Sequence, residues 1–181
     1  MTPTETLKHE HQVILLVLGR AEREAQSIHG GAAVDVDTIA EMLEFFRTFA
    51  DGCHHAKEER QLFPALATRG MSPEVKPVAV MLAEHEQGRA HVRGAAAALA
   101  RVGKGETAAA VALAGHLEGF VSLLRAHIFK EDNILFPMAD QVLSAEDQET
   151  LAVAFARVEA EEIGPGVHER FHELAHRLAQ G

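Results

Sequence analysis

The chain has 181 residues and a mass of 19.6 kDa, the size of one domain of ordinary length. It carries 17 Lys and Arg against 27 Asp and Glu, and the resulting net charge of −10 argues against a nucleic-acid or anionic-membrane partner, since both are bound through basic surfaces. A hydrophobic content of 47% is enough for a packed core, so disorder of the whole chain is not expected.

The N-terminus and the cysteine content point to the cytoplasm. The first residues are polar, and the longest apolar run, residues 13–18, is far shorter than a membrane span. The single cysteine, Cys53, excludes an internal disulfide and a cysteine-rich zinc site. We therefore expect a cytoplasmic protein without a membrane partner. Histidine is frequent, with 12 residues, whereas Trp and Tyr are absent.

Every predicted element is a helix, because apolar residues recur at steps of three and four and no stretch alternates with a period of two. The first helix is predicted over about 3–28 and ends at Gly30-Gly31, where glycine readily adopts the left-handed conformation. Asp37 or Thr38 is expected to cap the second helix.

The second helix is predicted to end before Gly70 and Pro73. Ser144 and Asp147 form a capping-box pattern that opens a fifth helical segment. The later helices are predicted over about 74–101, 106–139 and 144–179, the last interrupted by Gly-Pro-Gly at 164–166.

The lengths of these helices predict the architecture. Four helices of about 25–30 residues, each roughly 40 Å long and joined by short loops, favour an up-down-up-down four-helix bundle. The segment at about 144–179 is expected to lie across or beside the bundle. We predict an all-α fold with an additional C-terminal helical segment.

An internal repeat carries the residues best suited to chemistry. His54 and Glu58 form a His-x-x-x-Glu motif, and His127 and Glu131 form a second one. In both copies a Leu-Phe-Pro sequence follows, with the proline ten residues after the histidine. We expect Leu and Phe to pack in the core and the proline to disturb the helix after the motif.

The first and third helices also match each other, since each contains a Glu-His pair: Glu10-His11 in the first and Glu84-His85 in the third. His11 precedes the first motif by 43 residues, and His85 precedes the second by 42. The sequence therefore consists of two helix pairs, and each pair offers one histidine from its first helix and a His-x-x-x-Glu motif from its second.

Residues four apart share one face of a helix, so the histidine and glutamate of each motif project together. In a bundle of two such pairs the inner faces converge, and the side chains form one layer. Imidazoles and carboxylates suit a pair of first-row transition metals, which would also offset the cost of burying two glutamates. The predicted ligands are His11, His54, Glu58, His85, His127 and Glu131.

Two choices between neighbouring candidate ligands stay open. His55 and Glu59 are also four residues apart, but alignment with the second repeat favours His54 and Glu58, which leaves His55 outside the site or at the surface. In the first helix His9 competes with the chosen histidine, which continues an apolar stripe.

The remaining histidines are interpreted as structural or solvated. His29 and His91 could line the mouth of the site, but solvated positions are favoured. The stripe of His168, His172 and His176 contains two Glu-x-x-His sequences on one short helix and is interpreted as a polar helix edge. A ligand or lid from Glu159, Glu162 or His168 stays open.

At these motifs the sequence resembles the hemerythrin-like HHE cation-binding domains, over about residues 5–140. The resemblance implies one hemerythrin-like domain over 1–181, with a four-helix bundle and accessory helices at about 144–179. It implies a non-haem centre of two iron ions with an oxo or hydroxo bridge, held by the six residues above. Glu58 and Glu131 would bridge the two irons.

The chain departs from oxygen-carrying hemerythrins at two places. They have a second histidine four residues along the third helix, where this chain has Arg89. Their last carboxylate is an aspartate, where this chain has Glu131 with Asp132 beside it. The pattern looks closer to bacterial proteins linked to the repair of iron centres under nitrosative stress.

Two functional hypotheses follow. In the first, the centre binds or reacts with oxygen, nitric oxide or peroxide during oxidative or nitrosative stress. In the second, the protein is an iron sensor or reservoir in which metal loading controls folding or a partner contact, as in the hemerythrin-like iron-sensing F-box proteins. Zinc or manganese in place of iron is a variant of both.

A purely structural bundle ranks last, since it leaves two core glutamates unexplained. Sequence does not decide whether the ligand is turned over, which protein partner is used or what the oligomeric state is.

Overall fold

The computed structural model describes the backbone of residues 1–181 and every side chain except that of Glu162, so the suggestion of Glu162 as a ligand lies outside the described residues. All regular structure among these residues is helical, which confirms the all-α prediction. That the whole chain forms a single domain stays a prediction.

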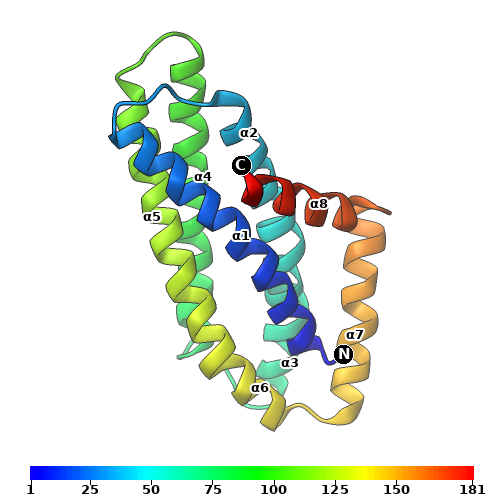
Figure 1. Ribbon diagram of the computed structural model, residues 1–181. Coiled ribbons are helices and arrows are strands. Elements are labelled where there is room, and N and C mark those ends of the chain that lie inside the picture. The colour runs from blue at the N-terminus through cyan, green and yellow to red at the C-terminus, as the bar shows by residue number, and fades with distance from the viewer.

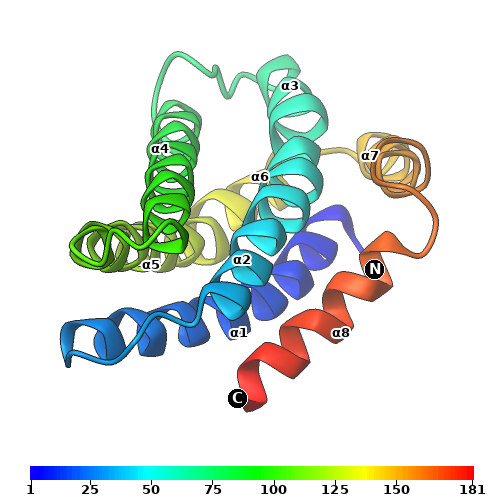
Figure 2. The same cartoon turned by 90° about the horizontal axis from the view of Figure 1, so that it is seen from above.

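Four long helical segments lie side by side, and successive segments run in alternate directions along the long axis of the molecule (Figure 1). Seen from above, their ends surround a common interior (Figure 2). The segments are α1 (Pro3–His29), α2 (Val36–Phe45) continuing through η1 (Phe46–His55) and η2 (Glu58–Leu62) to α3 (Phe63–Thr68), α4 (Val78–Gly103), and α5 (Ala109–Lys130) continuing through η3 (Glu131–Leu135) to α6 (Phe136–Val142).

Local sequence explains where the helices begin. The Ser144 side chain accepts a hydrogen bond from the Asp147 amide and forms the predicted capping box. The cap of α2 is Asp35 rather than the predicted Asp37 or Thr38. The Asp35 carboxylate accepts hydrogen bonds from both the amide and the hydroxyl of Thr38, which draws the helix start two residues earlier.

Widened, π-helical turns precede both Phe-Pro pairs. Glu58–Leu62 and Glu131–Leu135 are π-helical and end just before Phe63 and Phe136. A proline inside a helix lacks an amide donor and collides with the carbonyl four residues earlier, so a regular α-helical turn is disfavoured at each Phe-Pro pair. Each motif glutamate thus lies at the start of a widened turn, and that the proline disturbs the helix stays a prediction.

The interior contains two apolar clusters with a polar layer between them. Along α1 the change from one cluster to the other occurs between Leu7 and Val13, and along the fourth segment between Ile128 and Leu135. The predicted ligands of these segments, His11 and Glu131, fall in the gaps.

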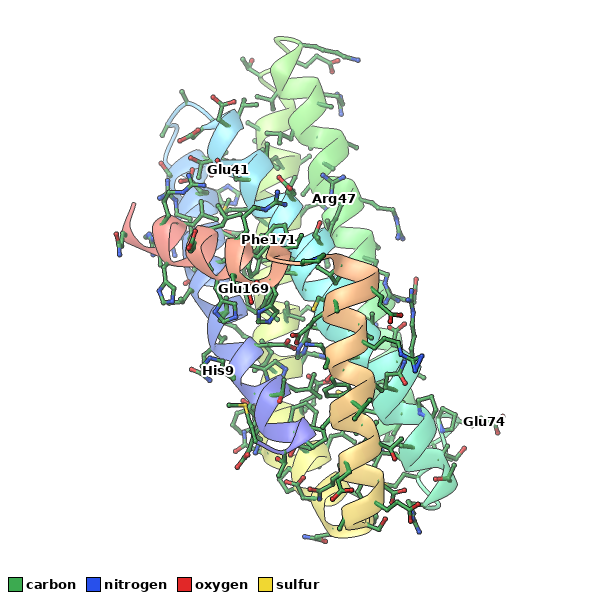
Figure 3. All side chains as sticks on the ribbon, turned by 90° about the vertical axis from the view of Figure 1, so that its right-hand side faces the viewer. His9, Glu41, Arg47, Glu74, Glu169 and Phe171 are labelled. Atoms are coloured by element: carbon green, nitrogen blue, oxygen red, sulfur yellow. The ribbon has the colours of Figure 1, made fainter. Side chains whose placement is uncertain are left out.

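The C-terminal helices α7 (Ala145–Arg157), η4 (Val158–Ile163) and α8 (Val167–Gln180) cover one side of the long segments. Leu151 and Phe155 of α7 are buried in the same cluster as Leu7. α8 crosses α1 and α2, and the Phe171 ring packs 6.0 Å from the Phe45 ring (Figure 3). The outer surface of the polar layer is therefore partly closed by the C-terminal part of the chain.

By length and apolar composition, the helix Ala109–Val142 meets the requirement for crossing a membrane. A core helix meets the same requirement. This one packs along α1 and α4 and carries the buried residues His127 and Glu131. Packing inside the protein accounts for its apolar inner face.

Candidate metal centre

The six side chains predicted as ligands lie together in the polar layer. Each is at most 1% exposed, and they come from all four long segments. His9, the alternative in α1, is exposed and stacks against His172 of α8. Glu59, the alternative in the second segment, lies outside the layer and accepts a hydrogen bond from His85.

The side chains form two groups in which one nitrogen or oxygen per residue lies within 4.8 Å of the others. Glu58 belongs to both. The first group is His11, His54, Glu58 and Glu131, and the second is His55, Glu58, His85 and His127.

Glu58 stands between the two groups. Its Oε1 lies 3.8 Å from Nε2 of His54, and its Oε2 lies 3.4 Å from Nε2 of His85. Each carboxylate oxygen therefore faces the imidazole of a different group, which is the arrangement that a carboxylate bridging two metal ions requires.

Glu131 repeats this geometry. Its Oε2 lies 3.2 Å from Nε2 of His11, and its Oε1 lies 3.1 Å from Nε2 of His127. The two glutamates of the sequence repeat are thus placed alike, as the matching registers of the two motifs imply.

A carboxylate holds the outer ring nitrogen of each of the five histidines. An ionised carboxylate only accepts hydrogen bonds, so Nδ1 carries a proton and Nε2 is the ring nitrogen that faces the layer. The pairs and their distances are His11–Asp132 at 2.8 Å, His54–Glu10 at 2.9 Å, His55–Asp51 at 3.3 Å, His85–Glu59 at 2.7 Å and His127–Glu84 at 2.8 Å.

The interior atoms of the layer suit a cation. Both oxygens of Glu58 and of Glu131, and Nε2 of His11 and His54, are buried without a hydrogen-bond partner among the described side chains. Buried carboxylates without donors are costly, and a metal ion removes that cost by coordination. The residues therefore fit the metal centre that the sequence predicts.

His55 is a residue that sequence reasoning placed outside the site. It is 4% exposed, and its ring stacks on that of His85 with centroids 3.9 Å apart. Successive side chains on a helix diverge by about 100°, so His54 reaches the first group and His55 reaches the second. The sequence signal that points to it is Asp51, four residues earlier, which holds its Nδ1.

Arg89 holds two of the outer carboxylates. Its Nε lies 2.9 Å from Oδ1 of Asp51, and its Nη2 lies 2.7 Å from Oε1 of Glu59. Because these carboxylates accept hydrogen bonds from His55 and His85, one guanidinium orients two histidines of the second group.

A buried lysine supports the first group. Lys57 is 0% exposed and forms ion pairs with Glu10, which holds His54, and with Glu159 of η4. His168 of α8 lies 3.4 Å from the same Glu10 carboxylate. Glu10, Glu159 and His168 are close enough to bind a metal, but the ammonium group between them makes this an ion-pair network.

The other histidines lie away from the layer. His29 is exposed, as predicted, and pairs with Glu118 at 3.2 Å. His91 is half-buried rather than solvated, and its ring lies 5.9 Å from that of His116.

Without metal, the layer retains protons. Burial opposes charge on His11 and His127, but their neighbouring carboxylates raise the pKa of each to about 9. Burial lowers the pKa of His54 to about 4. Burial and the adjacent Glu131 raise the pKa of Glu58. Metal binding must displace these protons.

We expect Glu58→Gln to lower metal content and to stabilise the metal-free protein. The amide keeps the shape of the side chain and stays neutral in the core without a bound proton. Metal content should fall to at most about one ion per chain, measured by elemental analysis, and the thermal midpoint after chelation should rise. Exposed Glu74 provides the control, Glu74→Gln, which should change neither. Full metal content in the Glu58 variant would contradict its bridging role.

We expect Arg89→Ala to weaken metal binding by about 10- to 100-fold, because Asp51 and Glu59 lose the cation that orients them. Competition with a chelator of known affinity measures the change. Arg101→Ala removes an exposed arginine that pairs with Glu106 and should leave the affinity unchanged. Equal affinities for the two variants would show that Arg89 does not position the histidines.

The stability of metal-free protein and its metal affinity should depend on pH in opposite directions. The folded state keeps protons on His11 and His127 up to about pH 9, whereas histidine in the unfolded chain releases its proton near pH 6.5. The free energy of unfolding should therefore fall as the pH rises across the window between these two values. Metal affinity should rise across it, since binding requires unprotonated imidazoles. Unfolding and metal titrations at both ends of the window check both trends, and a flat metal affinity would count against these ligands.

Comparison with known proteins agrees with this geometry. The model of the hemerythrin HHE cation-binding domain matches residues 2–139. Uncharacterised proteins of Mycobacterium bovis and of two strains of Mycobacterium tuberculosis are each 27% identical to it over 167 residues, which is 91% of this chain and 64% of theirs. No solved structure matches the chain. Because the matched domain covers most of the chain and every predicted ligand, the chain belongs to the hemerythrin HHE cation-binding domain family.

Proposed function

We propose that the protein is a non-haem di-iron protein that binds or reacts with oxygen, nitric oxide or peroxide. The observation that carries the proposal is the placement of Glu58 and Glu131, each of which directs its two oxygens toward different histidine groups. The proposal includes the up-down-up-down bundle of hemerythrin-like proteins as the scaffold, a cytoplasmic location, and a role in oxidative or nitrosative stress. The net charge of −10 supports the absence of a nucleic-acid partner.

The two iron positions differ in their nitrogen donors. His11 and His54 would hold one iron, whereas His55, His85 and His127 would hold the other. With both glutamates shared, the position with two histidines keeps more room for an exogenous ligand. Iron bound there would supply one-electron oxidation and reduction and a coordination position for a small molecule.

His55 can replace the histidine that oxygen-carrying hemerythrins have at the position of Arg89. Oxygen-carrying hemerythrins take a further nitrogen from the third helix, and this chain has an arginine there. We propose that His55, on the neighbouring helix, supplies that nitrogen, and that Arg89 supports it through Asp51.

The surroundings of the layer favour a small ligand. The Phe136 ring stacks on His11 with centroids 5.5 Å apart, and the Phe63 ring lies 6.1 Å from His85. These neighbours offer no hydrogen bonds to a polar substrate, but a diatomic molecule or peroxide needs few beyond those of the metal.

An iron sensor or reservoir is the second candidate. The ligands come from all four long segments, and Glu10 links the first group through Lys57 to the C-terminal helices. Loading would therefore tie distant parts of the chain together and stabilise the fold.

The first test is the metal content of protein purified from iron-replete cells. We expect about two irons per chain, and about one in His55→Gln, whereas His29→Gln, at an exposed histidine, should keep both. The loaded protein is then exposed to oxygen, nitric oxide and peroxide while its visible absorption is followed. Rapid spectral change supports the first candidate, and strong thermal stabilisation without spectral change supports the sensor. Protein that takes up no redox-active metal would overturn both.

A further inference from the structure

A cavity of about 200 Å³ opens between the second and third long segments, beside the second histidine group. Its lining includes His55, whose other side faces the second group, and residues of η1, α4 and α5. The proposed metal chemistry does not use this cavity.

The inner wall of the cavity is apolar. Phe46, Ala50, Val92 and Phe120 line it, and each is at most 8% exposed. Gly88 also lines the cavity, and a Cβ at this position would contact the Phe120 ring at 3.4 Å, so a large side chain here would take up space beside that ring. A ligand in the cavity must therefore have an apolar body.

The polar lining of the cavity has a surplus of positive charge. Three arginines contribute, and Arg89 is neutralised by Asp51 and Glu59. Asp51 is the acidic residue of the lining, and its carboxylate already accepts hydrogen bonds from Arg89 and His55. The exposed side chains of Arg47 and Arg93 have no acidic partner among the described side chains, although the chain as a whole has a net charge of −10 (Arg47 is labelled in Figure 3).

We propose that this cavity binds a small monocarboxylate with a short apolar chain. The carboxylate pairs with Arg47 and Arg93, and the chain lies against Phe46 and Phe120. A volume of about 200 Å³ is below the roughly 300–1,000 Å³ of sites for drug-sized ligands, so the occupant is a chain of several carbons rather than a long-chain lipid. The bound acid lies beside His55, next to the proposed metal centre, but its binding does not require the metal.

Calorimetric titration with three probes of equal chain length tests the charge and the shape of the ligand. Hexanoate should bind, 1-hexanol should bind at least about tenfold more weakly, and hexylammonium should not bind. The hexanoate affinity should also fall with added salt, because guanidinium groups at the rim are screened.

The double variant Arg47→Ala/Arg93→Ala should lower the hexanoate affinity at least about tenfold. Arg157→Ala is the matched control, since Arg157 is exposed on α7, away from this cavity, and it should leave the affinity unchanged. Gly88→Leu should fill the cavity and abolish binding, with circular dichroism as the check on folding.

Hexanoate binding that is no tighter than hexanol binding, or that is unaffected by the double variant, would overturn the proposal. All titrations are run on metal-free and on iron-loaded protein. Protein that takes up no iron but binds hexanoate contradicts the di-iron function alone. Iron-loaded protein that ignores hexanoate contradicts the cavity proposal alone.

Discussion

The burial of two carboxylates between apolar clusters is the constraint on which the rest of the structure depends. Glu58 and Glu131 are both 0% exposed, and none of their oxygens forms a hydrogen bond with a described side chain. Such a layer would be strongly destabilising in a bare core. Metal coordination resolves this conflict, and every histidine of the layer is oriented for it. The layer that would destabilise the metal-free core most is therefore also the part best arranged to bind a metal ion. Functional sites typically depart in this way from the local rules that stabilise a fold.

The support of the layer is divided between two sides of the molecule. On one side Arg89 acts through Asp51 and Glu59 on the second group. On the other side Lys57 is buried against Glu10 and connects the first group to η4 and α8. The two histidine groups thus have different nitrogen counts and different cationic supports. In the proposed di-iron centre, this difference would let the protein set the affinities and potentials of the two metal positions separately.

The repeated Leu-Phe-Pro sequence links local structure to this geometry. In each motif the glutamate opens a π-helical turn that ends just before the Phe-Pro pair. Phe63 and Phe136 follow these turns and close the layer on one side as members of the adjacent apolar cluster. The same local feature on the second and fourth segments gives Glu58 and Glu131 their matching positions.

The sequence by itself determined the helices, the doubled motif and six residues of the layer. These follow from local rules: apolar periodicity, caps, and the shared face of residues four apart. Tertiary structure decided what depends on neighbours from other segments. His55 follows His54 in the chain, and its burial became visible only once α4 placed His85 against it. Likewise, Glu10 accepts a hydrogen bond from His54 and Glu84 accepts one from His127, although each glutamate is followed in the chain by another histidine of the layer. A helix directs adjacent side chains about 100° apart, so packing between segments selects the partner of each glutamate. The arginine-rimmed cavity beside His55 also arises only where two helices meet.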